Sequence, residues 1–85
     1  MSERLVTVAS PVGLHARPAA LFVRAVAASG TPVTIRKEDG KPVDASSILA
    51  VLSLNVAHGD SVVLSASDDA ESTLDSLAEL LRTTH

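Results

Sequence analysis

The 85-residue sequence contains no cysteine, tryptophan or tyrosine, and it has one phenylalanine, Phe22. Without cysteine the chain can form no disulfide and has no thiolate for catalysis or metal binding, which is typical of proteins from reducing compartments. The lack of aromatic residues argues against binding to single-stranded nucleic acid, because such binders usually stack bases on exposed aromatic rings. The core must therefore be built mainly from aliphatic side chains.

Long apolar runs are also missing. A helix that spans a bilayer needs about 20 consecutive apolar residues, and no run in this sequence approaches that length. No basic leader followed by an apolar stretch is present either. We therefore expect a cytoplasmic protein that does not insert into membranes. A chain of this length has room for one core, so we expect a single domain over residues 1–85.

Charge is distributed unevenly along the chain, although the formal net charge is only −3. Residues 1–43 contain six basic and three acidic residues, whereas residues 44–85 contain one basic and seven acidic residues. The negative total argues against a general affinity for nucleic acid. A local positive region near Arg17 and Arg24 could still bind an anion or an acidic protein surface.

The first half of the sequence predicts a strand, a helix and a hairpin. Residues 4–8 are short and rich in β-branched side chains, as is typical of a strand. Apolar residues at positions 19, 22, 23 and 26 recur with helical spacing, and we expect Gly30 to end that helix in a left-handed conformation. Asp39-Gly40 lies between two alternating segments and predicts a tight hairpin turn with positive φ angles.

The second half predicts a helix, a strand and a final helix. Residues 47–54 fit a strand or a short helix, and the helix is favoured because Ser46 or Ser47 can cap its start and Asn55 can close it. Residues 60–66 predict a strand, and apolar residues at 74, 77, 78 and 81 predict the last helix. Acidic residues at 68, 69 and 71 would lie at the positive end of its dipole.

The predicted order β-α-β-β-α-β-α indicates an α+β fold, with an antiparallel sheet covered on one face by helices. Periodicity does not determine the order of the strands within that sheet. A ferredoxin-like sheet and an open-faced sandwich share this element order, so both remain open at this point.

The most reactive side chains of the sequence stand at the start of the first predicted helix. If His15 lies at or near the N-cap, the backbone amides of Ala16 and Arg17 have no acceptor within the helix and can bind an anion. The helix dipole and the Arg17 guanidinium add positive charge there, and the planar guanidinium matches phosphate oxygens. Pro18 is well tolerated in a first turn.

Such a pocket suits an imidazole that accepts a phosphoryl group. Neutral histidine carries a lone pair on one ring nitrogen, and positive surroundings favour this nucleophilic form. Histidine is also among the side chains that form covalent intermediates. His15 is therefore the candidate phosphoryl acceptor, and Arg17 is the candidate group that stabilises the phosphate.

The segment "GLHARPAA", residues 13–20, resembles the active-site signature of HPr, the histidine-containing phosphocarrier family of the bacterial phosphoenolpyruvate-dependent sugar phosphotransferase system. The segment "SSILAVLSLNVAHGD", residues 46–60, the chain length and the predicted element order are also similar to that family. The resemblance implies an open-faced β-sandwich, in which four antiparallel strands carry three helices on one face.

The resemblance further implies a carrier without a cofactor rather than an enzyme. In this reading His15 takes a phosphoryl group on Nδ1 from phospho-enzyme I and delivers it to a histidine on the IIA domains of sugar permeases, with Arg17 assisting. Ile48, Leu49 and Leu52 match the apolar docking patch of the family, and Arg24 would add a charge at its rim. We expect a monomer, since a carrier presents one face to successive partners.

Ser47 aligns with the serine that a regulatory ATP-dependent kinase phosphorylates in many family members, so a serine kinase/phosphorylase is a further candidate partner. A phosphate there would place about two negative charges beside the docking surface. This chain departs from the family pattern twice, because Ser46 stands where a basic residue commonly precedes that serine and Asn55 replaces a common glycine. A plain N-cap role for Ser47 therefore remains an alternative.

Two other functions stay open. The chain could be a regulatory docking module of the same fold that acts mainly through phosphorylated Ser47. It could also be a ferredoxin-like hydrolase of acyl phosphates, although the sequence offers no obvious residue to orient a water molecule. His58 is expected in a turn and His85 is the last residue, and neither has a partner at ligand spacing, so we expect no metal site.

Overall fold

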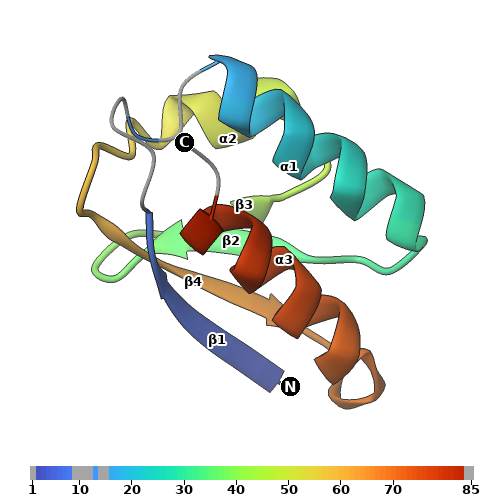
Figure 1. Cartoon of the computed structure of the whole chain (residues 1–85). Helices are drawn as coiled ribbons and strands as arrows, with labels where there is room; N and C mark the ends of the chain where they lie inside the picture. Colours follow the sequence, from blue (N-terminus) through green and yellow to red (C-terminus); the bar gives the residue numbers. More distant parts are fainter. Residues whose placement is uncertain (1, 9–12, 14–15, 84–85) are drawn as a thin grey trace.

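The computed structural model describes residues 2–8, 13 and 16–83. The elements follow one another as β1 Ser2–Thr7, α1 Ala16–Ser29, β2 Thr34–Lys37, β3 Val43–Asp44, α2 Ile48–Ser53, β4 Ser61–Ala66, the short 3-10 helix η1 Asp68–Ala70 and α3 Glu71–Thr83 (Figure 1). The predicted β-α-β-β-α-β-α order is confirmed, and the ambiguous segment 47–54 forms a helix.

The four strands form one sheet in the order β1-β4-β2-β3, and every neighbouring pair is antiparallel. Strand β4 lies in the interior, where Val62 pairs with Val6 of β1 and Leu64 pairs with both Arg4 of β1 and Ile35 of β2. This strand order is that of the open-faced sandwich. The ferredoxin-like alternative is therefore wrong.

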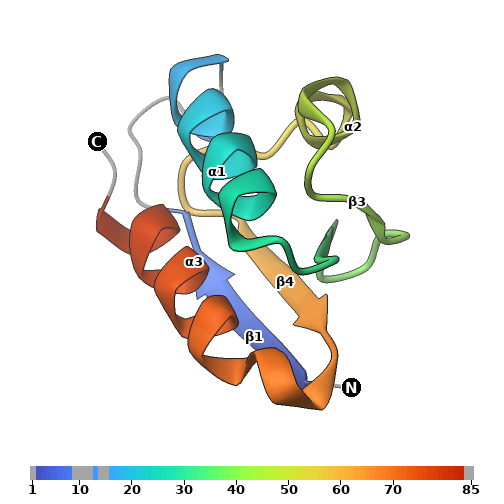
Figure 2. The ribbon, with the colours of Figure 1, turned by 90° about the vertical axis from the view of Figure 1, so that its right-hand side faces the viewer.

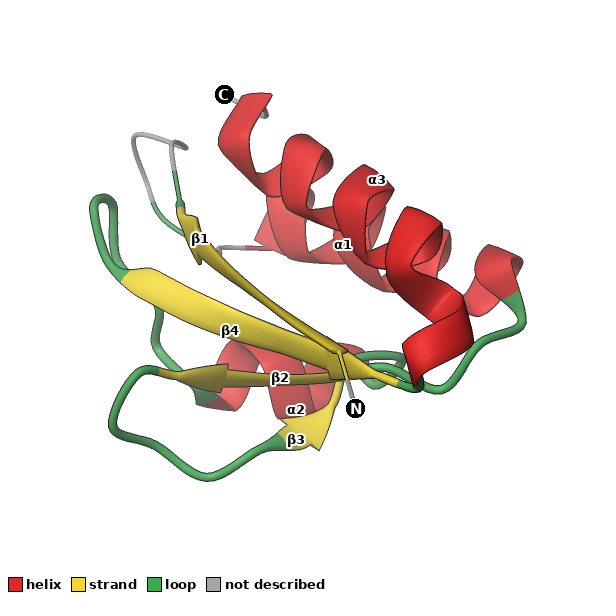
Figure 3. Ribbon diagram, turned by 90° about the horizontal axis from the view of Figure 1, so that it is seen from below, coloured by secondary structure: helices red, strands yellow, loops and turns green. Residues whose placement is uncertain are grey.

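The helices lie on one face of the sheet, where α1 and α3 run side by side and α2 contacts α1 (Figure 2). Seen from below, the described part of the chain places no helix on the other face (Figure 3). Alternation along β4 agrees with this layering, because Val62 and Leu64 join the main core whereas Val63, on the opposite face, does not. The architecture is thus two layers, with the core between the sheet and the helices.

The core is aliphatic apart from one ring, as the composition predicts. Its largest fully buried side chains come from both layers: Phe22, Ile35, Leu64, Leu74, Leu81, Val6, Val8, Val51 and Val62. The helical spacing predicted for α1 is confirmed, since Ala19, Phe22 and Val26 are buried and Val23 packs partly against them. Each layer therefore supplies a continuous apolar surface to the other.

The turns differ in how well the sequence predicts them. Gly30 has φ +68° directly after α1, and Asn55 has φ +54° beyond α2, so both predicted helix ends are confirmed. The tight hairpin turn is wrong in detail, because Gly40 does not adopt a positive φ. Its amide donates to the Lys37 carbonyl (3.0 Å), which makes Gly40 the last residue of a four-residue turn, a position that needs no left-handed backbone.

The acidic residues near the start of α3 do more than face its dipole. The Arg4 Nε donates to Asp75 (2.7 Å), and another Arg4 nitrogen lies 3.2 Å from Glu71, so α3 is tied to β1 by charge. Half-exposed pairs of this kind contribute little to stability but favour one orientation of the helix. Sequence spacing did not reveal this pairing, since about 70 residues separate its members.

Candidate functional site

The start of α1 is the structural setting of the predicted site. The helix begins at Ala16, directly after His15, and its first turn contains no acidic residue. His15 itself lies outside the described residues. Within the described part of the chain, no protein acceptor is bonded to the amides of Ala16 and Arg17. Buried Pro18 has no amide to satisfy, so this helix end offers donors that a ligand could use.

Arg17 is exposed, and among residues 16–83 it makes no ion pair with a carboxylate. Ala20, Leu21 and Arg24 follow it at helical spacing, and all three are exposed. They form one outer face of α1, to which Arg17 and Arg24 contribute two cations. Leu21, which is 43% exposed, was not among the predicted site residues, although its position four residues after Arg17 could have indicated it.

The short helix α2 supplies the predicted apolar patch. Leu49 is 78% exposed and Ile48 is 36% exposed, so both present side chains to solvent. Leu52 is partly buried and packs against the core, so it supports the patch and contributes less to its surface. We call Ile48 and Leu49 the apolar patch of the helix layer; α2, which carries them, contacts α1, on which Leu21 is exposed.

Ser47 is the N-cap of α2. Its backbone is extended (φ −104°, ψ 115°), and its hydroxyl oxygen accepts a hydrogen bond from the Ala50 amide (3.3 Å). The preceding turn is held by Asp44, whose carboxylate accepts from the Ser46 hydroxyl (2.6 Å) and from the Ser46 amide (2.9 Å). The structure therefore gives Ser47 a capping role, and Ser46 takes part in the turn Asp44–Ser47, which the Ser47 amide closes by donating to the Asp44 carbonyl (3.2 Å).

We expect the Asp44 turn to depend on pH. Hydrogen bonds from the Ser46 hydroxyl and then from its amide lower the pKa of Asp44 in the folded state. A lowered pKa means that ionised Asp44 stabilises the fold above the unfolded-state value of about 3.9, and that this gain is lost as pH falls through the folded-state value.

Urea unfolding of the wild-type protein and of Asp44→Ala at several pH values measures this effect. The difference in unfolding free energy should be present at pH 7 and should shrink as the pH falls below about 3.9. Asp39→Ala is the matched control, because Asp39 is exposed in the hairpin and accepts no hydrogen bond among the described residues. A difference for Asp44→Ala that stays constant with pH would contradict the assignment.

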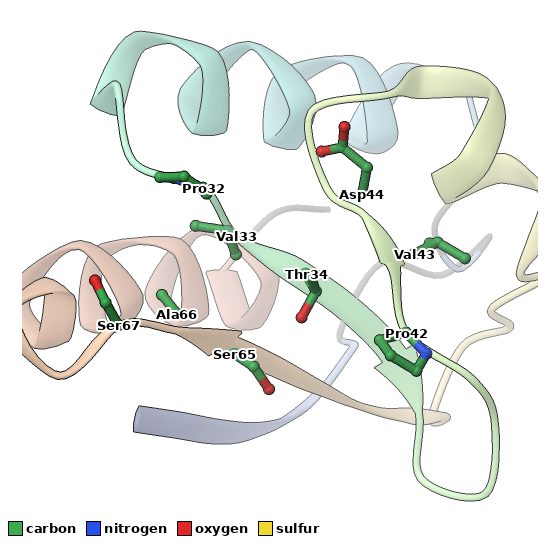
Figure 4. Close-up of a pocket in the computed structure, with 9 residues that line it drawn as sticks. All are labelled: Pro32, Val33, Thr34, Pro42, Val43, Asp44, Ser65, Ala66 and Ser67. Carbon is green, nitrogen blue, oxygen red and sulfur yellow. The ribbon is translucent and has the colours of Figure 1, made fainter. Parts of the chain in front are cut away.

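A separate hollow of about 510 Å³ lies where β2 and β3 meet the end of β4 (Figure 4). Its walls are mostly apolar, including Pro32, Pro42 and Val43, and Asp44 is its one charged lining residue. None of the predicted site residues lines it. The hollow is therefore distinct from the start of α1.

The part of the chain that the structure describes has neither a cluster of metal ligands nor a membrane-spanning helix. No group of three or more histidine, cysteine, aspartate or glutamate side chains there could hold a metal ion. None of the helices formed by residues 16–83 has the length and apolarity to cross a bilayer.

Comparison with known proteins places these features in a family. Residues 2–83 match the family model described as the PTS HPr component phosphorylation site. The chain is 52% identical over 82 residues to a phosphocarrier protein HPr of Streptomyces coelicolor, an alignment that covers 95% of this chain and 88% of that protein.

Solved structures agree. The crystal structure of HPr-C-His from Thermoanaerobacter tengcongensis superposes with a TM-score of 0.86 at 39% identity, over 95% of this chain and 91% of that one. Crh of Bacillus subtilis, described as a catabolite repression protein that forms a domain-swapped dimer, superposes with a TM-score of 0.71 at 40% identity, over 95% of this chain and 93% of that one. The sequence match, the strand order and the helix layer lead to one conclusion: this chain belongs to the HPr family, the phosphocarriers of the phosphotransferase system.

Proposed function

We propose that His15 is the residue on which this phosphocarrier holds its phosphoryl group, taken from phospho-enzyme I and passed to the IIA domains of sugar permeases. The observation that carries the proposal is the signature "GLHARPAA" at the start of a helix whose first amides have no acceptor among the described residues. We further propose that residues 1–85 act as one domain and that the protein is cytoplasmic, a location that fits the family.

The transfer itself needs little from the protein beyond position and charge. A ring nitrogen of neutral His15 attacks phosphorus, a P–N bond forms, and the bond from phosphorus to the donor breaks. The amides of Ala16 and Arg17 and the Arg17 guanidinium face the oxygens that carry the negative charge. The reverse sequence delivers the group to the next protein. No cofactor takes part in these steps.

We assign the docking of both partners, phospho-enzyme I and the IIA domains, to the outer face of the helix layer. Exposed Ile48 and Leu49 supply the apolar area. Leu52 packs against the core and supports them, and exposed Arg24 adds a cation on the neighbouring helix α1. An apolar patch with charge at its rim suits transient binding to several proteins. The cations of α1 favour partners with an acidic surface.

A regulatory function through Ser47 is the second candidate, because Ser47 lies directly before the exposed Ile48 and Leu49. Phosphorylation by a serine kinase would replace the hydroxyl that caps α2 and place about two negative charges beside the patch. Repulsion would then weaken binding to an acidic partner. The similarity to Crh, a catabolite repression protein, supports considering this role.

One labelling experiment distinguishes these functions. The wild-type protein is incubated with enzyme I and ³²P-labelled phosphoenolpyruvate, with ATP and a serine kinase, or with a ³²P-labelled acyl phosphate alone. Acid-labile, base-stable label from phosphoenolpyruvate supports the carrier. Label that requires ATP and resides on Ser47 supports regulation, which can coexist with the carrier role. Release of phosphate from an acyl phosphate without any protein adduct would overturn both in favour of hydrolysis.

Charge reversal at Arg17 should impair transfer without unfolding the protein. We expect Arg17→Glu to lower the rate of phosphoryl transfer by roughly 100-fold or more, since loss of one donor to a developing anion typically has that effect. Arg17 is exposed, so Tm should change little. Rapid-quench transfer assays and thermal unfolding measure the two quantities.

Lys41→Glu is the matched control for Arg17→Glu, because it makes the same charge change at an exposed hairpin position. It should transfer at nearly the wild-type rate. A large fall in Tm with normal transfer in Arg17→Glu would count against the role assigned to this guanidinium.

We propose that the carrier works as a monomer. Crh, its relative, forms a swapped dimer, so the state of this chain is to be measured by size-exclusion chromatography with light scattering. A monomer that accepts label at the full rate supports the proposal, and label confined to a dimer fraction would overturn it.

A further inference from the structure

Gly13 lies so close to the backbone of Val56 and Ala57 that no residue with a side chain could take its place. Gly13 is buried and has φ +73°. A Cβ atom there would overlap the carbonyl oxygen of Val56 and would lie 2.7 Å from the Cα of Ala57. These are backbone atoms, which a side chain cannot push aside without moving the chain. Glycine is therefore required at position 13 both for this close backbone contact and for the positive φ angle.

The backbone that Gly13 approaches, Val56 and Ala57, leads into a closed turn that ends at Asp60. The Asp60 amide donates to the Ala57 carbonyl (3.0 Å), and the Ala57 amide donates to the Asp60 carboxylate (2.9 Å). The turn is also bonded to the residue after β1, because the Val8 amide donates to the Asp60 carbonyl (3.0 Å) and the Gly59 amide donates to the Val8 carbonyl (3.1 Å). Four hydrogen bonds thus hold residues 57–60.

An ion pair also stabilises this turn. The Lys37 ammonium of β2 lies 3.5 Å from the Asp60 carboxylate. The pKa of Asp60 is lowered, chiefly by the Ala57 amide and further by Lys37, so the carboxylate is ionised at neutral pH. We call Val56 together with the turn Ala57–Asp60 the seat of Gly13.

Gly13 and the start of α1 lie on either side of His15. Only Leu14 and His15 separate Gly13 from Ala16, the first residue of the helix. Gly13 and Ala16 are only three peptide links of about 3.8 Å apart along the chain, so a displacement of either end must be taken up by the backbone torsions of the two residues between them, one of which is His15. The placement of Gly13 on its seat therefore limits where the phosphoryl acceptor can be.

We propose that Gly13 and Asp60 are positioning residues for phosphoryl transfer: Gly13 seats the signature segment on the turn Ala57–Asp60, and the Asp60 carboxylate holds that turn in shape. The inference rests on the function proposed for His15. Neither residue touches the phosphoryl group. Each acts through the backbone, and a displacement of about 1 Å in a reacting group can lower a rate by about 100-fold.

Gly13→Ala tests the seat, and the chain offers a matched control. Gly30 has nearly the same φ, +68°, but a Cβ there would meet nothing within 4 Å. Gly30→Ala therefore introduces the same backbone strain without the overlap. We expect Gly13→Ala to lower kcat for acceptance from phospho-enzyme I at least about tenfold, and Gly30→Ala to stay within about twofold of wild type.

Two variants of Asp60 test whether its carboxylate holds the turn Ala57–Asp60 in shape. Asp60→Ala removes the acceptor of the Ala57 amide and should lower kcat. Asp60→Asn keeps an oxygen that can accept this bond, so it should restore most of the rate. An Asp60→Asn protein as slow as Asp60→Ala would overturn the role assigned to the hydrogen bond.

A second measurement does not depend on phosphoryl transfer. The NMR signals of the ¹⁵N-labelled His15 ring should shift in Gly13→Ala and Asp60→Ala and stay unchanged in Gly30→Ala. Equal losses of Tm in the two glycine variants, with unchanged kcat and unchanged ring signals in Gly13→Ala, would overturn the proposal. Failure of the wild-type protein to label at His15 would instead refute the proposed function, and the ring signals would still report on positioning.

Discussion

Replacing His15 with alanine should abolish phosphoryl acceptance from phospho-enzyme I. We expect the acid-labile label to fall by at least about a thousandfold, because no other group in the signature can form the covalent intermediate. The Arg17 guanidinium is a hydrogen-bond donor without an acceptor lone pair, so it has no electron pair to offer phosphorus. The anion-binding amides of α1 would remain, but they bind phosphate without accepting it covalently.

The other two histidines provide the controls for His15→Ala. His85→Ala should label like the wild-type protein, and thermal unfolding should show that His15→Ala is folded. Label that persists in His15→Ala and disappears in His58→Ala would contradict the assignment, since it would place the acceptor in the turn that carries exposed His58. Mass spectrometry of the labelled protein under alkaline conditions identifies the modified residue directly.

Replacing Phe22 with alanine should have the largest effect on stability. Phe22 is the one aromatic residue of the chain, is fully buried and belongs to the main core. Truncation of a buried phenylalanine typically costs about 3–5 kcal/mol, because it removes apolar burial and leaves a cavity. Small domains are stable by only about 5–15 kcal/mol. We therefore expect Tm to fall by roughly 12–40 °C.

Leu21→Ala is the matched control for Phe22→Ala. It is the adjacent residue on the same helix, but its side chain is 43% exposed, so its truncation should cost under about 1 kcal/mol. Urea unfolding at 15 °C measures both variants. Similar losses for the two would contradict the packing described for α1. Under conditions in which Phe22→Ala is still folded, the variant should accept label at His15, because the Phe22 side chain that it lacks packs in the core and does not face the phosphate.

Stability and transfer are thus assigned to different sides of α1. The inner side, with Ala19, Phe22 and Val26, packs on the sheet, and the outer side presents Arg17 and Leu21. A substitution on one side should change one property and spare the other. Gly13 is the exception, because its contact with the backbone of Ala57 links the packing of the fold to the position of His15.

Local patterns in the sequence were enough to predict most elements and the candidate site. The spacing of Ala19, Phe22 and Val26, the cap at Ser47 and the left-handed residues after the helices depend on neighbours within a few positions, where propensity and hydrogen bonding act directly. The signature around His15 is local in the same sense. Whether His15 carries the phosphoryl group stays a prediction, since that residue lies outside the described structure.

Only the tertiary structure decided how distant segments meet. It set the strand order β1-β4-β2-β3, the pairing of Arg4 with Glu71 and Asp75, and the contact between Gly13 and the turn at Ala57. It also showed that the turn at Gly40 needs no positive φ. These features depend on burial and contact between residues that are far apart along the chain, and periodicity carries no information about which distant surfaces pack together.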